Sequence, residues 1–274
     1  MTNTSCPTQF LAVDGANLAY DVTGRGPAVL LLHAGLGDRT MWDAQVPALA
    51  DAFTVIRLDA RGFGETRKPP VVYSPVDDAL AVLDHLGFKQ AHVVGVSMGS
   101  QTAIELAVIA PARVASLVAV AARTGVAVSP ELRAEWDRVD EIFEAGDVEG
   151  ANEYELRMWV DGPNRTPDMI DPAFRERVRA MNLALLVRDD AEGEEIALDP
   201  PAAARLGEIT APCLILYGDQ DIADVQDAGP KLAQAIPGAS LVVMPGVSHL
   251  PQMEQPDRFN AMVLGFLRQV ADRA

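Results

Sequence analysis

The chain has 274 residues, with 22 Lys and Arg against 39 Asp and Glu, so its formal net charge is −17. This acidic balance disfavours nucleic acid and anionic membranes as partners, and no apolar run in the sequence is long enough to span a bilayer. Two cysteines, Cys6 and Cys213, are too few for a disulfide framework. Because the first residues also lack the pattern of a signal peptide, we expect a cytoplasmic protein with reduced thiols.

The first part of the chain alternates apolar runs with helical patterns. Residues 9–24 favour a hairpin that turns at Asp14-Gly15. The apolar runs beyond it are typical of strands buried on both faces of a parallel sheet. The expected strands are 28–32, 54–58, 92–94 and 116–121, and the expected helices lie near 43–50, 75–86 and 98–110. This alternation indicates a doubly wound, mostly parallel sheet.

A loop with two glycines follows the first buried strand and reads His33-Ala34-Gly35-Leu36-Gly37. The glycines permit a turn whose backbone N–H groups point inward, an arrangement that binds anions. We therefore expect the N–H of Gly35 to bind a developing oxyanion, with Leu36 as the alternative donor. His33 is expected to support the loop by hydrogen bonds rather than to act as a base.

The pentapeptide Gly95-Val96-Ser97-Met98-Gly99 lies between a predicted strand and a predicted helix. A serine on so tight a turn needs neighbours with almost no side chain two residues away, which explains both glycines. Strand, glycine-flanked serine and helix together define a nucleophile elbow. Ser97 is therefore the expected nucleophile, and the N–H of Met98 is the second expected oxyanion donor.

From about 124 to 206 the alternation of strands and helices stops, and apolar residues recur at helical spacing. A helical insertion at this place would cover the carboxyl ends of the strands and shape a pocket. Trp159 is expected to bind substrate by lining this pocket, and Met158 and Met181 are further candidates.

Four arginines are candidates for charged roles. Arg61, in the turn Asp59-Ala60-Arg61-Gly62, is expected to form a structural ion pair. Arg123 follows the strand after the elbow helix, and it is the first candidate to bind a substrate carboxylate, because a guanidinium holds that group through two hydrogen bonds. Arg157 and Arg165 lie in the insertion, where most arginines are simply solvated.

The last part of the chain offers partners for Ser97. Two apolar runs, 214–217 and 241–244, are expected strands that end at Asp219-Gln220-Asp221 and at Ser248-His249. With one helix between them, at about 227–236, they would be adjacent parallel strands whose ends meet at one edge of the sheet. His249 is expected to be the base and Asp221 to hold its tautomer, with Asp219 as the alternative acid. A final helix is expected over about 256–270.

These motifs together resemble the α/β-hydrolase superfamily over about residues 9–270. The resemblance rests on the motifs at 31–35, 41–42, 58–64, 95–99, 217–221, 248–251 and 254–256. Within the superfamily the chain is most similar to the small esterases and lactonases around 3-oxoadipate enol-lactonase. One departure is the oxyanion loop, which commonly reads His-Gly and here reads His33-Ala34-Gly35. The resemblance implies an α/β-hydrolase fold with a helical lid insertion.

The sequence thus predicts a serine hydrolase that cleaves a small carboxylic ester or lactone through an acyl-enzyme, without metal or cofactor. We expect the core domain to comprise residues 1–123 and 207–274 and the lid to comprise residues 124–206. The expected partner is a small-molecule substrate, and the chain is compatible with a homo-oligomer. The alternatives are a carbon–carbon bond hydrolase of a ring-cleavage product, a cofactor-free perhydrolase or haloperoxidase, and a receptor-like protein with vestigial hydrolysis. Haloalkane dehalogenases and epoxide hydrolases are disfavoured, because they carry an aspartate where this chain has Ser97.

Overall fold

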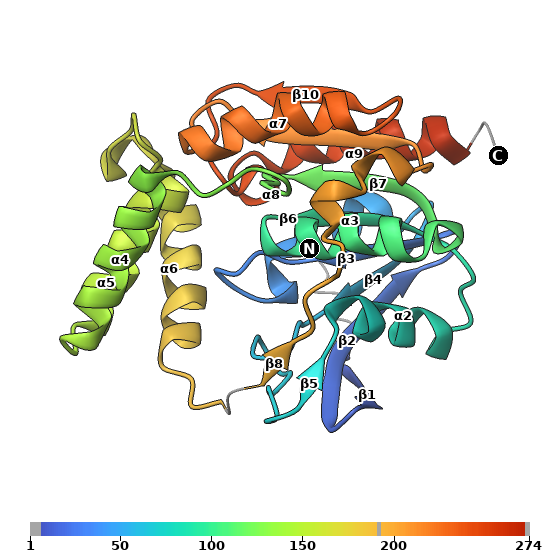
Figure 1. Ribbon diagram of the computed structural model, residues 1–274, viewed down its shortest axis with the longest axis horizontal. Coiled ribbons are helices and arrows are strands. Elements are labelled where there is room, and N and C mark those ends of the chain that lie inside the picture. Colours follow the sequence, from blue (N-terminus) through green and yellow to red (C-terminus); the bar gives the residue numbers. More distant parts are fainter. Residues whose placement is uncertain (1–6, 191–192, 272–274) are drawn as a thin grey trace.

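The computed structural model describes residues 7–190 and 193–271, and its centre is one large sheet. The strands of this sheet are β1 (Gln9–Val13), β2 (Ala16–Gly24), β3 (Ala28–Leu32), β4 (Thr54–Leu58), β6 (Ala91–Val96), β7 (Val114–Val120), β9 (Cys213–Gly218) and β10 (Ser240–Met244). Their order is β1-β2-β4-β3-β6-β7-β9-β10 (Figure 1). β2 pairs antiparallel with β1 and β4, and the other pairs are parallel. The predicted mostly parallel sheet and its N-terminal hairpin are confirmed.

Helices cover both faces of the sheet. They are α1 (Val46–Leu49), α2 (Pro75–His85), α3 (Met98–Ile109), α7 (Ala223–Ala235), α8 (Pro251–Glu254) and α9 (Pro256–Ala271). α2, α3 and α7 share one core with Leu30 and Val93, whereas α1 and α9 share the other with Leu31 and Val94. Because neighbouring strand residues point to opposite faces, both faces need apolar side chains, and the central strand β3 is an unbroken apolar run.

The helix expected near 43–50 is much shorter than predicted. Only Val46–Leu49 is α-helical, and the chain before it forms the 3₁₀ helix η1 (Arg39–Trp42). Pro47 lacks an N–H group, so it fits only the first turn of an α-helix and prevents the helix from starting earlier. The helix expected at 227–236 begins instead at Ala223.

The segment between β7 and β9 is largely helical. Its elements are α4 (Pro130–Glu144), α5 (Val148–Leu156), the π-helical turn η3 (Arg157–Asp161), η4 (Pro167–Met169) and α6 (Pro172–Leu186). The three α-helices stand together at one end of the molecule (Figure 1). The chain then returns along the core through β8 (Glu194–Glu195), which pairs with β5 (Val72–Tyr73), and the 3₁₀ turns η5 (Ala202–Ala204) and η6 (Leu206–Glu208). A further 3₁₀ turn, η2 (Pro111–Arg113), precedes β7. That residues 124–206 form a separate unit stays a prediction.

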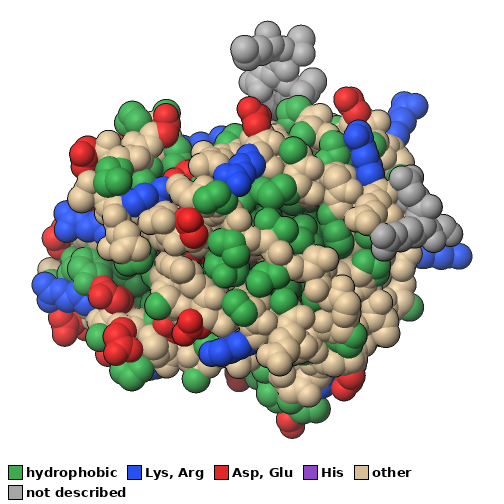
Figure 2. All heavy atoms as spheres, turned by 90° about the horizontal axis from the view of Figure 1, so that it is seen from above, with side chains coloured by type: hydrophobic (Ala, Val, Ile, Leu, Met, Phe, Trp, Pro, Cys, Tyr) green, Lys and Arg blue, Asp and Glu red, His purple; other side chains and the backbone are tan. Residues whose placement is uncertain are grey.

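Charged side chains are unevenly spread over the face that Figure 2 shows. In Figure 2, acidic and basic side chains crowd the end occupied by α4, α5 and α6, while hydrophobic side chains gather near the middle of the face.

No helix within residues 7–190 and 193–271 is both long and apolar enough to cross a membrane. Cys213 is buried and unpaired, and burial raises the pKa of its thiol to about 12; Cys6 lies outside the described residues.

Candidate active site

Ser97 occupies a strained turn between β6 and α3. Its backbone has φ 52° and ψ −114°, a region that residues with a side chain rarely adopt. The flanking glycines are required by space: a Cβ at Gly95 would lie 2.1 Å from the carbonyl oxygen of Gly99, and one at Gly99 would lie 2.3 Å from that of Leu32. The turn therefore presents the serine above the end of the sheet, as the sequence predicts.

The structure brings Ser97, His249 and Asp221 into one chain of contacts. Ser97 Oγ lies 2.8 Å from His249 Nε2, and the two Asp221 carboxylate oxygens lie 2.9 and 3.0 Å from His249 Nδ1. Asp221 is fully buried and His249 is 3% exposed. Burial in this geometry fixes the imidazole with Nδ1 toward the carboxylate and Nε2 toward the hydroxyl, which suits proton removal from serine.

Asp219, the alternative acid, has a different position. Its Oδ1 accepts hydrogen bonds from the backbone N–H of Gly246 at 2.7 Å and from the Gln220 amide at 3.0 Å. It therefore ties the turn after β9 to the turn after β10. The structure places Asp221, and not Asp219, against His249.

The loop after β3 is held by two side chains. His33 Nδ1 donates to the carbonyl of Ala34 at 2.8 Å, and its Nε2 accepts the N–H of Ala60 at 3.0 Å. The sulfur of Met41 accepts the N–H of Ala34 at 3.2 Å. Burial lowers the pKa of His33, which keeps it neutral as this bonding requires. The supporting role predicted for His33 is confirmed, and the role of Met41 was not foreseen.

The two residues expected to supply the oxyanion donors, Gly35 and Met98, are neighbours in space. Met98 is the first residue of α3, where backbone N–H groups lack partners within the helix. A Cβ at Gly35 would come within 4.0 Å of Met98 Sδ, so the loop passes directly beside the elbow. Leu36, the alternative donor, has its side chain buried in the core. Their function as an oxyanion hole stays a prediction.

Trp159 contacts the base rather than the cavity at Ser97. It lies in the π-helical turn η3, its ring centroid is 4.5 Å from that of His249, and its carbonyl accepts the His249 N–H at 3.3 Å. Of the other two candidates, Met158 lines a separate cavity near α7, and Met181 packs by Gly37. Substrate binding by Trp159 stays a prediction.

Three of the four arginines named from the sequence form ion pairs. Arg61 donates to Asp78 twice at 2.7 Å, which confirms its structural ion pair. Arg165 pairs with Glu254, whose carboxylate also accepts the Ser248 N–H at 2.9 Å. This link from the helical segment to the loop of His249 was not predicted from the sequence, although Glu254 lies in one of the motifs on which the family resemblance rests. Arg157 is exposed and lies 3.5 Å from Glu153.

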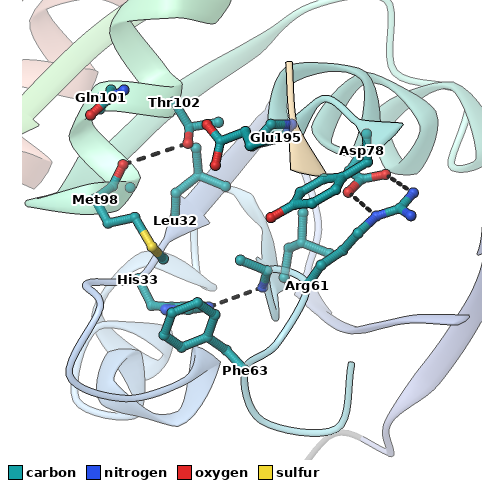
Figure 3. A pocket seen from close by; sticks show the side chains of 14 residues that line it. Leu32, His33, Arg61, Phe63, Asp78, Met98, Gln101, Thr102 and Glu195 are labelled. Carbon is teal, nitrogen blue, oxygen red and sulfur yellow. Dashed lines mark hydrogen bonds and ion pairs between the residues drawn. The ribbon is translucent and has the colours of Figure 1, made fainter. Parts of the chain in front are cut away.

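Two cavities adjoin the elbow, and Met98 and Gln101 line both of them. The one that Ser97 itself lines has a volume of about 460 Å³; its other walls are Glu105, Ala121, Arg123–Val126, Val128 and Pro201–Ala203. The second, of about 140 Å³, has Met98 at one side and the Arg61–Asp78 pair at the other, with Glu195 beside Thr102 (Figure 3). Among the described residues, no group of three or more His, Cys, Asp or Glu could hold a metal ion.

Known proteins share this fold. The family model of the alpha/beta hydrolase fold matches residues 27–256. A 2-hydroxy-6-oxononadienedioate/2-hydroxy-6-oxononatrienedioate hydrolase from Burkholderia vietnamiensis is 32% identical, over 93% of this chain and 93% of its own. The crystal structure of an enol-lactonase from Burkholderia xenovorans LB400 superposes with a TM-score of 0.77 at 27% identity, covering 95% of this chain and 100% of its own. A hydrolase from Pseudomonas aeruginosa PA01 gives 0.76 at 32% identity, with 95% and 98% covered.

The chain therefore belongs to the α/β-hydrolase family, and it is an enzyme of that class. The expected fold is confirmed. The relatives differ in what their names say they act on, so family membership leaves the substrate open.

Proposed function

We propose that the enzyme is a serine hydrolase that cleaves a small carboxylic ester or lactone through an acyl-enzyme on Ser97. One observation carries the proposal: Ser97 Oγ lies 2.8 Å from His249 Nε2, and Asp221 lies 2.9 Å from His249 Nδ1. A serine hydroxyl is a poor nucleophile by itself, and a base at hydrogen-bond distance, held by a buried carboxylate, is what activates it.

In the proposed reaction, Ser97 Oγ attacks the carbonyl carbon while His249 Nε2 takes the hydroxyl proton. The tetrahedral oxyanion accepts hydrogen bonds from the backbone N–H groups of Met98 and Gly35. His249 then returns its proton to the departing alkoxide oxygen, which leaves an acyl group on Ser97. Water attacks this acyl group while His249 takes the water proton, and His249 then passes that proton to Ser97 Oγ as the bond to the acyl group breaks, which releases the carboxylic acid. For a lactone, the product is one hydroxy acid.

Asp221 acts through the base. Its carboxylate holds the imidazole tautomer and stabilises the imidazolium that forms in each step. None of these steps needs a metal or an organic cofactor. We also propose that α4, α5 and α6 serve as a lid within residues 124–206, and that the enzyme works on a small molecule in the cytoplasm.

A carbon–carbon bond hydrolase is the second candidate. It is favoured by the relative from Burkholderia vietnamiensis, named for the hydrolysis of an oxononadienedioate, which matches 93% of this chain. The same three side chains would serve that reaction. Turnover of a ring-cleavage product, and not of simple esters, would favour this reading.

Ser97→Ala tests the proposal, because alanine fits the turn and removes only the hydroxyl. Hydrolysis of p-nitrophenyl esters and lactones should fall by a factor on the order of 10³ or more. A fluorophosphonate probe should label Ser97 in the parent enzyme, and thermal unfolding should show that the variant folds. Activity within tenfold of the parent, or a label on another residue, would contradict the assignment. Bromination that depends on peroxide, in the same screen, would indicate the haloperoxidase alternative.

A further inference from the structure

Arg123 carries a guanidinium on the wall of the candidate active site. It lines the same cavity as Ser97, and it is the only Lys or Arg among the described residues of that lining. Its guanidinium has neither a hydrogen bond nor an ion pair to any part of the chain that the structure describes. Arg61 and Arg165, by contrast, each bind a carboxylate.

The guanidinium is held in place by an aromatic ring. Its central carbon lies 5.3 Å from the centroid of Trp136 on α4, a distance at which a cation is attracted to a ring face. Burial lowers the pKa of Arg123, and the negative charges of Asp224 and Asp221 oppose this effect. A partly desolvated cation with unpaired donors gains most from an anion that arrives with a ligand.

The other charged group in the cavity lining is acidic. Glu105 accepts a hydrogen bond from Gln101 at 3.1 Å, and burial raises its pKa. The whole chain carries −17, so an anion approaches against the mean field of the protein. Arg123 is thus the group through which this cavity would accept a negative charge.

We infer that Arg123 binds a carboxylate of the substrate, and that the substrate class is an ester or lactone that carries a second, free carboxylate. This inference rests on the proposed function for its reaction, and on the lone guanidinium for its specificity. The planar guanidinium would bind both carboxylate oxygens, and the bond to be cleaved would lie at Ser97, in the same cavity.

Two esters of equal length separate charge recognition from general binding. Mono-p-nitrophenyl adipate carries the free carboxylate, and p-nitrophenyl hexanoate lacks it. Arg123→Gln should raise KM for the adipate ester about tenfold or more, because a charged hydrogen bond is lost, and should leave KM for the hexanoate ester within about twofold.

Arg133→Gln is the matched control. It removes the same charge, and its guanidinium lies 6.0 Å from the same Trp136 ring, but it is not among the residues that line the cavity. It should change neither KM by more than about twofold. Equal effects of Arg123→Gln on both esters, or equal effects of the two variants, would overturn the inference.

Failure of the reaction and failure of the subsite are distinguishable. If the parent hydrolyses hexanoate through Ser97 but prefers it to the adipate ester, the subsite is wrong and the proposed function stands. If neither ester is hydrolysed, calorimetry of monomethyl adipate and dimethyl adipate still tests the subsite. The parent should bind only the anion, and Arg123→Gln should bind neither. Equal binding by both proteins would overturn the inference.

Discussion

The contact between Trp159 and His249 yields a prediction that separates positioning of the base from binding of the substrate. The indole lies 4.5 Å from the imidazole, centroid to centroid, with an interplanar angle of 44°. Replacing Trp159 by leucine keeps an apolar group against the base and removes the aromatic face. The backbone bond from the His249 N–H to the Trp159 carbonyl does not depend on the side chain.

The size of the effect follows from the kind of contact. An aromatic pair contributes about 0.5–1.5 kcal/mol beyond its buried area, and a cation over a ring about 0.5–2 kcal/mol. The second contribution is present only while His249 is an imidazolium, which is during the chemical steps. A net loss of about 1–2 kcal/mol in the transition state corresponds to about 5–30-fold in kcat, with little change in KM.

The assay compares Trp159→Leu and Trp159→Phe with the parent on a neutral ester. The phenylalanine variant keeps an aromatic ring and should recover most of kcat. Trp136→Leu is the matched control, since Trp136 lies in the same helical segment and contacts Arg123 rather than His249. Labelling by a fluorophosphonate should slow in parallel with kcat, and thermal unfolding should show that each variant is folded.

Three results would refute the positioning argument. A kcat for Trp159→Leu within twofold of the parent would mean that the ring does not act through the base. An equal loss in Trp159→Phe would mean that shape, and not aromatic character, is needed. A rise in KM alone would return Trp159 to the substrate-binding role expected from the sequence.

The remaining predictions concern the acid and the supporting histidine. Asp221→Asn should lower kcat by a factor on the order of 10³ or more, because only Asp221 contacts the base. Asp219→Asn should keep kcat within about tenfold of the parent. If steady-state kinetics give the reverse ranking, the acid is misassigned. Burial lowers the pKa of His33, so its contribution to stability is fully present above about pH 6.5 and is lost as the pH falls through the lowered value. His33→Gln removes this titration, so below about pH 6.5 the free energy of unfolding should fall less steeply, by at most about 1.4 kcal/mol per pH unit, and Tm should fall less steeply with it. The slope due to His92, whose pKa is also lowered, should remain. An unchanged pH profile would show that His33 does not titrate as argued.

What the sequence determines here is local or follows from repetition. Gly95 and Gly99 are needed because a Cβ at either would lie within 2.3 Å of a backbone carbonyl oxygen. The nucleophile elbow can therefore be predicted from a stretch of five residues. The strands can be predicted because burial of both faces of a parallel sheet makes its strands rich in apolar residues. The order serine, aspartate, histidine is informative because the carboxyl ends of parallel strands meet at one edge.

The tertiary structure alone decides which side chains meet across that edge. Asp219 and Asp221 are two residues apart, and only the positions of two turns show that Asp221 reaches His249 while Asp219 binds Gly246. The sequence cannot tell a paired arginine from an unpaired one, because their partners lie far along the chain. Arg165 forms an ion pair with Glu254, 89 residues further along the chain, whereas Arg123 lies over the Trp136 ring and has no hydrogen bond or ion pair to the described residues. The sequence shows which residues are charged, whereas only the packing around a charged residue shows whether it is free to bind a ligand.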